Sequence, residues 1–204
     1  MPRPYRLGER AAQVEATRER ILDAAVELYV KVGISAATLR EIGIRADVAP
    51  GTLRSHFASR DELDRAIVER MASVVTLPDV SMFEGVGSIE KRLARVIRAG
   101  GIFIEEARPL YRMWLREPML TAPWTEKGAE YGARWEELMR SALGPLADDD
   151  EALSVLRAII HPEFFESVRA GNRSREEASA LIAAVVTPWF TARARERTRN
   201  SRSG

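Results

Sequence analysis

The sequence predicts an all-α protein, with three helices in an N-terminal domain and further helices in a larger C-terminal domain. Three observations lead to this fold class. Apolar residues recur every three or four positions through most of the chain, which is the period of a helix. The alternation with a period of two that marks strands is absent. Glycine, proline and Ser/Thr-x-x-Glu boxes divide the chain at intervals suited to helices.

The best domain boundary is the stretch TLPDVSMFEGVG, residues 76–87, which contains one proline and two glycines. We therefore expect a domain of residues 1–75, which includes a fourth, linking helix, and a domain of residues 76–204.

Composition narrows the class of protein. The chain has 204 residues, 46% of them hydrophobic and 30% charged, and it contains no cysteine. Disulfides and thiolate chemistry are thereby excluded, and zinc sites are disfavoured. The N-terminus has no apolar core of a signal peptide, and no apolar run approaches the ~20 residues of a membrane span. We expect a cytoplasmic protein with no membrane partner.

Enzyme signatures are missing. The two histidines, His56 and His161, are too few and too far apart for a typical metal cluster. No nucleophile motif and no phosphate-binding glycine loop occurs. The run Asp148-Asp149-Asp150 is better explained as acidic residues at a helix N-terminus than as metal ligands. We expect no catalysis, no cofactor and no metal.

Basic charge gathers at the N-terminal end. Residues 1–60 carry 10 Lys and Arg against 7 Asp and Glu, whereas residues 61–204 carry 21 against 23. The excess is modest and is also compatible with a solvated surface.

The N-terminal helices have clear start and stop signals. The first covers about 17–32, with Ile21, Ala24, Ala25, Leu28 and Val32 on one face, and stops at Gly33. The box Thr38 to Glu41 opens a second helix at about 38–46, with Leu39, Ile42 and Ala46 inward. A third helix, 50–56, starts at Pro50, and the box at Ser59 opens a fourth that runs to about Val75.

The stretch VAPGTLRSHF, residues 48–57, is mostly polar surface held by two apolar anchors, Leu53 and Phe57. The second and third helices are joined by a turn of three or four residues, which is the spacing of a helix-turn-helix. A helix that enters the major groove of DNA needs small or hydrogen-bonding residues on its outer face. The composition of residues 50–56 fits that requirement.

Residues 17–70 resemble the N-terminal domain of TetR-family transcriptional regulators. The resemblance rests on Ile21-Leu22-Asp23-Ala24-Ala25, on Gly33, on Gly51-Thr52-Leu53-Arg54-Ser55-His56-Phe57, and on Ser59-Arg60 with Leu63. It covers about a quarter of the chain. Departures from the family pattern are Gly43 for Ala, Asp47 for Gly, Ala49 for Ser, Arg54 for Tyr and Arg60 for Lys. Asp47 still suits a left-handed turn, but the departures put the usual operator sequence in doubt.

The motif and the resemblance together give a set of candidate DNA contacts. Helix N-termini favour phosphate, Arg54 suits phosphate or guanine, and the resemblance implies phosphate contacts for His56 and for the cation at 60. His56 as a cap of its own helix, and Arg40 as a solvated side chain, stay open. The set is Thr38, Arg40, Pro50, Gly51, Thr52, Arg54, Ser55, His56 and Arg60.

In the C-terminal domain we expect helices at about 88–107, 108–119, 123–142, 149–170 and 174–194. The resemblance implies that the last two pair with their copies in a four-helix bundle. The last helix has an apolar face wider than one neighbour needs, and the helix before it is also rich in apolar residues, although burial within the chain is the alternative. The predicted dimer residues are Phe164, Leu181, Ile182, Val185 and Trp189.

A small-molecule site is expected between the helices of this domain, since such sites are mostly apolar and aromatic. Gly100 and Gly101 inside a helical pattern would leave room for a guest, but a plain core role fits each aromatic residue as well. The candidate ligand residues are Phe103, Tyr111, Trp114, Tyr131, Trp135 and His161.

These expectations combine into a homodimeric repressor that a small-molecule ligand releases from a palindromic operator in double-stranded DNA. Two alternatives remain: a helical dimeric interaction module without DNA binding, and an orphan regulator without a small-molecule ligand.

Overall fold

The structure, a computed structural model, describes residues 3–115, 117 and 120–200; for residues 3–7, 114 and 115 it describes the backbone alone. Every regular element in this described part is helical, which confirms the predicted fold class. The chain divides into two units, Met1–Val75 with Arg108–Gly128, and Thr76–Ala107 with Ala129–Gly204. The division after Val75 coincides with the predicted boundary. Residues 108–128, which we expected in the C-terminal domain, belong to the first unit.

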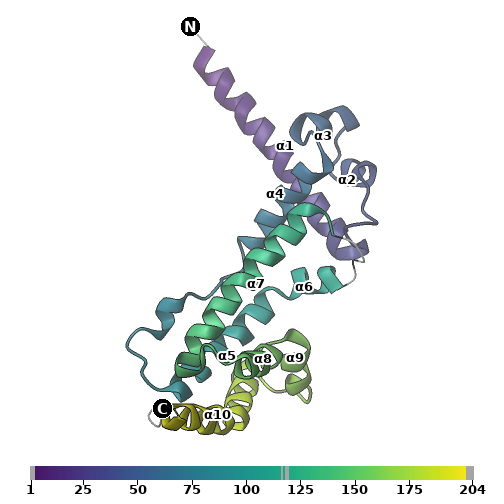
Figure 1. The fold of residues 1–204 in the computed structure, drawn as a ribbon. Coiled ribbons are helices and arrows are strands. Elements are labelled where there is room, and N and C mark those ends of the chain that lie inside the picture. Colours follow the sequence, from purple (N-terminus) through teal and green to yellow (C-terminus); the bar gives the residue numbers. More distant parts are fainter. Residues whose placement is uncertain (1–2, 116, 118–119, 201–204) are drawn as a thin grey trace. The chain divides into compact units, whose positions relative to one another are not determined.

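The first unit begins with α1 (Arg3–Val32), the purple helix of Figure 1. The predicted start near residue 17 is too late, because residues 9–16 are strong helix formers that extend a helix already nucleated. The predicted stop is confirmed, since Gly33 has a φ of +95° and its N–H donates to the Tyr29 carbonyl at 3.0 Å. Val32, expected on the buried face, is exposed, and Tyr29 is buried instead.

Helices α2 (Leu39–Arg45) and α3 (Pro50–His56) lie where the sequence predicts them. The Thr38 hydroxyl accepts from the Glu41 amide at 3.2 Å, and the Glu41 carboxylate accepts from the Thr38 amide at 3.0 Å, which confirms the capping box. Leu39, expected to face inward, is 36% exposed.

The turn between α2 and α3 depends on Asp47, whose φ of 52° is left-handed, as the sequence predicts. The next residue, Val48, donates its N–H to the Gly43 carbonyl at 3.0 Å. This turn fixes the direction in which α3 leaves α2.

The core of the first unit joins α1, α2, α3 and α4 (Arg60–Ala72) to α6 (Arg108–Leu115) and the start of α7 (Ala122–Leu143). The N-cap of α4 is Ser59, which accepts from the Glu62 amide at 3.1 Å. Members of this core include Ile21, Ala25, Tyr29, Ile42, Leu53, Phe57, Leu63, Ile67, Met113 and Trp124.

The second unit contains η1 (Val80–Phe83), α5 (Ile89–Glu106), the rest of α7, η2 (Gly144–Leu146), α8 (Asp150–Ile159), α9 (Pro162–Arg169) and α10 (Arg175–Asn200). The predicted linker is therefore partly ordered, because Phe83 of η1 is buried in this unit's core. The main pairing is that of α5 with α10.

Two glycines let neighbouring side chains approach α5 closely. A Cβ on Gly100 would lie 2.7 Å from Cγ2 of Ile160, and a Cβ on Gly101 would lie 2.6 Å from the ring of Phe165. The expectation that this pair leaves room for a guest is wrong, because side chains of the same unit fill the space.

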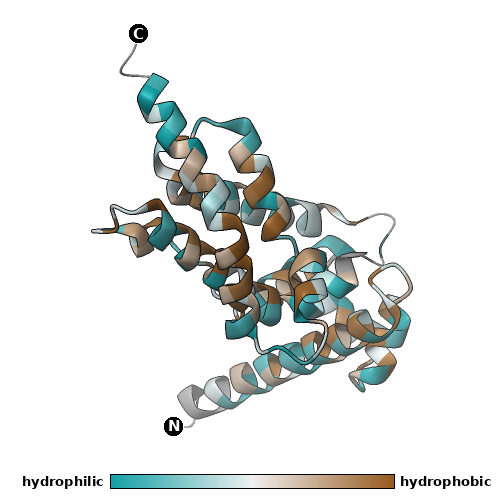
Figure 2. Ribbon diagram, turned by 90° about the horizontal axis from the view of Figure 1, so that it is seen from below, coloured by the Kyte–Doolittle hydropathy of each residue, from teal (hydrophilic) through white to brown (hydrophobic). Residues whose placement is uncertain are grey.

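One predicted helix is two. The chain breaks between α8 and α9 at His161, which has an extended backbone with φ −67° and ψ 135°. The cause is Pro162, since a residue that precedes proline avoids the helical region. Proline does not interrupt α10, which carries Pro188 inside and runs to Asn200 rather than to residue 194. Figure 2 shows its last turns, next to the C-terminus, in hydrophilic colours. Within the described ranges, no helix is both long enough and apolar enough to cross a membrane.

Candidate nucleic-acid interface

The outer face of α3 is exposed, and two side chains hold its inner face. Leu53 is 3% exposed and Phe57 is 2% exposed, so both anchors lie in the core as expected. Pro50, Gly51, Thr52, Arg54 and Ser55 are all exposed, and His56 is partly exposed. The short helix, labelled α3 in Figure 1, thus has small and hydrogen-bonding residues on its exposed face.

The first turn of α3 has no side-chain cap. Its N-cap, Ala49, makes no side-chain cap hydrogen bond, and Pro50 has no N–H. The amides of Gly51 and Thr52 therefore point out of the first turn without a helical acceptor. A Cβ on Gly51 would meet nothing within 4 Å, so another molecule has room to approach the backbone there.

The cations of this face differ in their partners. Arg54 and Arg40 are exposed. Arg45, on the same helix as Arg40, forms an ion pair with Glu27 of α1. Arg40 and Arg54 are therefore the better candidates to meet an anion from outside.

Thr38 has a local role. Its hydroxyl donates to the Glu41 carboxylate at 2.7 Å. Hydrogen bonds from the Thr38 backbone and side chain hold the pKa of Glu41 below its usual value, so this carboxylate stays ionised and keeps its two donors. The exposed hydroxyl of Thr38 is already used to start α2.

Arg60 is turned into the first unit, unlike the other predicted DNA contacts. Its Nη1 donates to the Ala37 carbonyl and its Nη2 to the Ile34 carbonyl, both at 2.7 Å. Its Nε donates to Asp64 at 2.9 Å, and its Cζ lies 5.0 Å from the centroid of the Tyr29 ring. The side chain is 28% exposed, and all three guanidinium nitrogens already have acceptors.

The buried carboxylate of Asp64, which pairs with Arg60, was not predicted from the sequence. Asp64 is 0% exposed and accepts from Arg60, from the Tyr29 hydroxyl and from the Thr121 hydroxyl. One signal was available, because an acidic residue four positions after an arginine on a helix is placed for an ion pair. Nothing local pointed to Tyr29 or Thr121.

The candidate ligand residues separate into groups. Phe103, Tyr131 and Trp135 form an aromatic cluster in the second unit, with ring centroids 6.0 Å apart for Phe103–Tyr131 and 5.0 Å for Phe103–Trp135. The buried Nε1 of Trp135 has no hydrogen-bond partner. His161 is exposed at the start of α9, Tyr111 belongs to the first unit, and the side chain of Trp114 lies outside the described residues.

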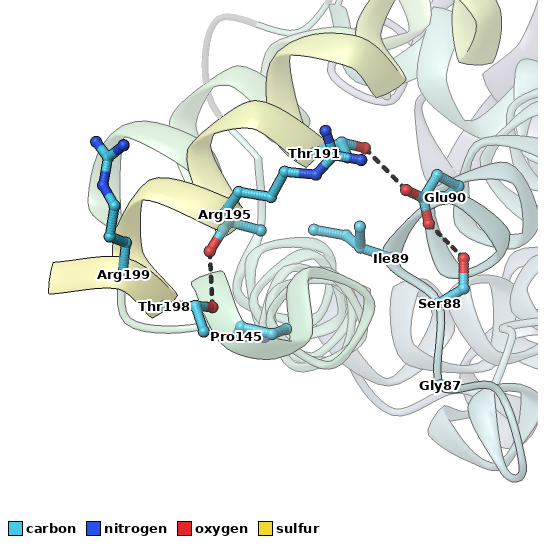
Figure 3. Close-up of a pocket in the computed structure, with 10 residues that line it drawn as sticks. Gly87, Ser88, Ile89, Glu90, Pro145, Thr191, Arg195, Thr198 and Arg199 are labelled. Atoms are coloured by element: carbon cyan, nitrogen blue, oxygen red, sulfur yellow. Dashed lines mark hydrogen bonds between the residues drawn. The ribbon is translucent and has the colours of Figure 1, made fainter. Parts of the chain in front are cut away.

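A cavity of about 570 Å³ lies elsewhere in the second unit, between the start of α5, Pro145 of η2 and the last turns of α10. Figure 3 shows Arg195 reaching toward Thr191 and Glu90 at its wall. Hydrogen bonds from the Ser88 and Thr191 hydroxyls, with Ser88 the larger cause, lower the pKa of Glu90. None of the candidate ligand residues lines this cavity. Among the residues that the structure describes, no group of three His, Asp or Glu side chains could hold a metal ion.

Four of the five predicted dimer residues are exposed apolar side chains of the second unit. Phe164 lies on α9, and Leu181, Val185 and Trp189 follow one another at i, i+4 and i+8 on α10. Ile182 lies in the core of its own unit. We call Phe164, Leu181, Val185 and Trp189 the apolar stripe.

In sequence, the chain matches one family model and several individual regulators. Residues 21–67 match the sequence model of the family described as bacterial regulatory proteins, tetR family. Over 58 residues the chain is 43% identical to the HTH-type transcriptional regulator SrpR of Pseudomonas putida, a match that spans 28% of this chain and only 27% of SrpR. Over 161 residues it is 27% identical to an uncharacterized HTH-type transcriptional regulator in the dhlA 5' region of Xanthobacter autotrophicus, across 76% of this chain and 79% of that one.

Among solved structures, the chain is similar to native NalD of Pseudomonas aeruginosa, described as the secondary repressor of the MexAB-OprM multidrug efflux pump. The TM-score is 0.58 at 20% identity, and the match covers 87% of this chain and 96% of NalD. At 20% identity this similarity shows the fold alone, and the matched region includes residues of both units.

Proposed function

Since this chain belongs to the TetR family of bacterial regulatory proteins, we propose that it is a transcriptional regulator that binds double-stranded DNA through α2 and α3. One observation carries the proposal: α3 is fixed by two buried anchors while its opposite face is exposed, polar and open at its first turn. A helix held in this way is suited to lie in the major groove.

Within this face, Arg54 reads a base or grips phosphate. Pro50, Gly51, Thr52 and Ser55 allow the helix to approach the groove closely, and Arg40 meets the backbone beside it. Repression is the expected outcome of binding, as described for NalD. A protein that binds a bacterial operator works in the cytoplasm.

The regulator acts as a homodimer, with the apolar stripe as the surface that pairs. A single short helix reads few bases, whereas two copies read a palindrome. Leu181, Val185 and Trp189 on one face of α10 are exposed, as is Phe164 of α9, and exposed apolar side chains of this kind are a typical interface signal.

We propose further that a small molecule with an aromatic or apolar body and a hydrogen-bond acceptor binds at Phe103, Tyr131 and Trp135. The unpartnered Nε1 of Trp135 is the donor that would fix its orientation. The ligand releases DNA only if it binds the two states of the protein with different affinity.

Selection of bound fragments from random DNA tests the first proposal. The selected operator is then titrated with the wild type, with Arg54→Ala and with Arg157→Ala, whose arginine pairs with Glu136 in the second unit. We expect Arg54→Ala to weaken binding by about tenfold or more and Arg157→Ala to leave it unchanged. If the wild type retains no DNA at low salt, the interaction-module alternative replaces this function. If DNA binds but no compound releases it, the orphan-regulator alternative holds.

A further inference from the structure

Asp64 connects three segments of the first unit through one buried carboxylate. Its Oδ1 accepts from Arg60 and from the Tyr29 hydroxyl, and its Oδ2 accepts from the Thr121 hydroxyl at 2.8 Å. A fully buried charge is stable only when its oxygens are paired in this way. The loss of one donor therefore disturbs the rest of the group.

Arg60 carries this arrangement to the DNA-binding helices. The carbonyls that it binds belong to Ile34 and Ala37, in the turn that leads from α1 to Thr38. Thr38 is the N-cap of α2, and α2 is joined to α3 by the short turn at Asp47. The guanidinium thus fixes the point where the chain enters α2.

Thr121 belongs to a segment of the first unit that is flanked in sequence, on both sides, by residues of the second unit. Residues 108–128 pack in the first unit, yet the residues on both sides of them, up to 107 and from 129, belong to the second unit. The backbone therefore enters this segment directly from the second unit after Ala107 and returns to that unit at Ala129. Its contacts within the first unit include Glu117 with the Ser35 amide at 3.2 Å and Glu126 with Arg65 at 3.1 Å. Both of these contacts are exposed, whereas the hydrogen bond of Thr121 reaches the buried carboxylate.

Resting on the proposed function, we infer that Asp64 is a positioning residue for DNA binding, and that the Thr121 hydroxyl is the contact through which segment 108–128 sets the entry of α2. With Thr121 in place, Asp64 holds Arg60 against the carbonyls of Ile34 and Ala37. With Thr121 withdrawn, an oxygen of Asp64 loses its donor, Arg60 shifts, and the first turn of α2 loosens. The recognition surface then loses affinity for its operator without any change in the residues that touch DNA.

A matched pair of threonines tests the inference. Thr121→Val removes the hydroxyl that reaches Asp64. Thr125→Val removes a hydroxyl that donates only to carbonyls of its own helix end, at Thr121 and Ala122. Operator affinity is measured by fluorescence anisotropy over a range of salt concentrations, at a temperature where circular dichroism finds each variant fully folded.

We expect Thr121→Val to weaken operator binding about tenfold at every salt concentration, which corresponds to about 1.4 kcal/mol of binding free energy. Thr125→Val should bind the operator as tightly as the wild type. The slope of log affinity against log salt stays at the wild-type value, because no phosphate contact is lost. A purely stabilising hydrogen bond would lower the melting temperature and leave the affinity of the folded protein unchanged, which would overturn the inference. If the wild type binds no DNA, the proposed function fails; if it binds and Thr121→Val binds equally well, only this inference fails.

A second variant tests the role of Arg60. Arg60→Gln is expected to weaken binding with an unchanged salt slope. If the slope of log affinity against log salt instead falls in magnitude by about 0.9, Arg60 contacts a phosphate, and the positioning role is overturned. Hydrogen exchange of the free protein gives an independent readout: in Thr121→Val the amides of Glu41 and Ile42, in the first turn of α2, should exchange faster than in the wild type and in Thr125→Val. Unchanged exchange at these amides contradicts the inference.

Discussion

The Cζ of Arg18 in α1 lies 5.2 Å from the centroid of the Phe57 ring, at the residue where α3 ends. The guanidinium covers an aromatic anchor whose own N–H donates to the Leu53 carbonyl at 2.9 Å. The end of α3 is therefore held by α1 through a cation–π contact as well as by burial.

A double-mutant cycle of Arg18→Met and Phe57→Leu measures this contact. Each change keeps most of the apolar volume, so the cycle isolates the interaction of the cation with the ring. We expect a coupling of about 0.5–1 kcal/mol in the free energy of unfolding, determined by urea denaturation. Additive effects of the two changes would show that the contact contributes nothing.

Gly101→Ala and Gly132→Ala form a second test, on α5 and α7. A Cβ at Gly101 would lie 2.6 Å from the Phe165 ring, whereas at Gly132 it would meet nothing within 4 Å. The first change should destabilise the protein by about 1–3 kcal/mol through overpacking. The second should stabilise it by up to about 1 kcal/mol, since alanine favours the helix. Urea denaturation of both variants measures this; a stabilised Gly101→Ala would mean that α5 is not packed as described.

Acid should break the ion pair between Asp149, the N-cap of α8, and Arg193 of α10. Arg193 donates to Asp149 at 2.6 and 3.0 Å and lowers the pKa of this carboxyl from 3.8 to about 2. Because the pKa is lower in the folded state, the contribution to stability is present above pH 3.8 and is lost as the pH falls toward about 2. Asp149→Asn keeps a good N-cap but removes the charge. Its melting temperature should lie below that of the wild type at neutral pH and converge with it in acid. A constant difference across this range would contradict the assignment.

The apolar stripe predicts the oligomeric state. Val185 is 68% exposed, and Val74, in the first unit, is 74% exposed and lies outside the stripe. Val185→Glu should shift the protein from dimer to monomer in light-scattering measurements, because pairing would bury a charge. Val74→Glu should remain dimeric. Dimers of both variants would move the interface away from the stripe.

The helix-turn-helix could be predicted from the sequence because its signals are local. Thr38 and Glu41, Gly33, Asp47 and Pro50 each act within a few residues, and the structure has all of them in their predicted roles. The break before Pro162 was equally local and was missed because an apolar pattern runs across it.

The network at Asp64 could not be predicted in the same way. The hydrogen bond from Thr121 joins residues 57 positions apart, and the one from Tyr29 joins residues 35 apart. No period or cap relates such positions. The position of Arg60 shows the consequence: its place in a family motif pointed to DNA, whereas tertiary contacts turn its guanidinium inward.

Pro188 gives the apolar stripe a polar feature. Proline has no N–H. The carbonyl of the exposed Ala184, four residues before Pro188, therefore lacks its usual helical donor. An acceptor covered by another surface without a donor costs about 1–3 kcal/mol. In the proposed dimer, a partner surface that brings a donor to that oxygen would therefore bind more favourably than a surface that is only apolar.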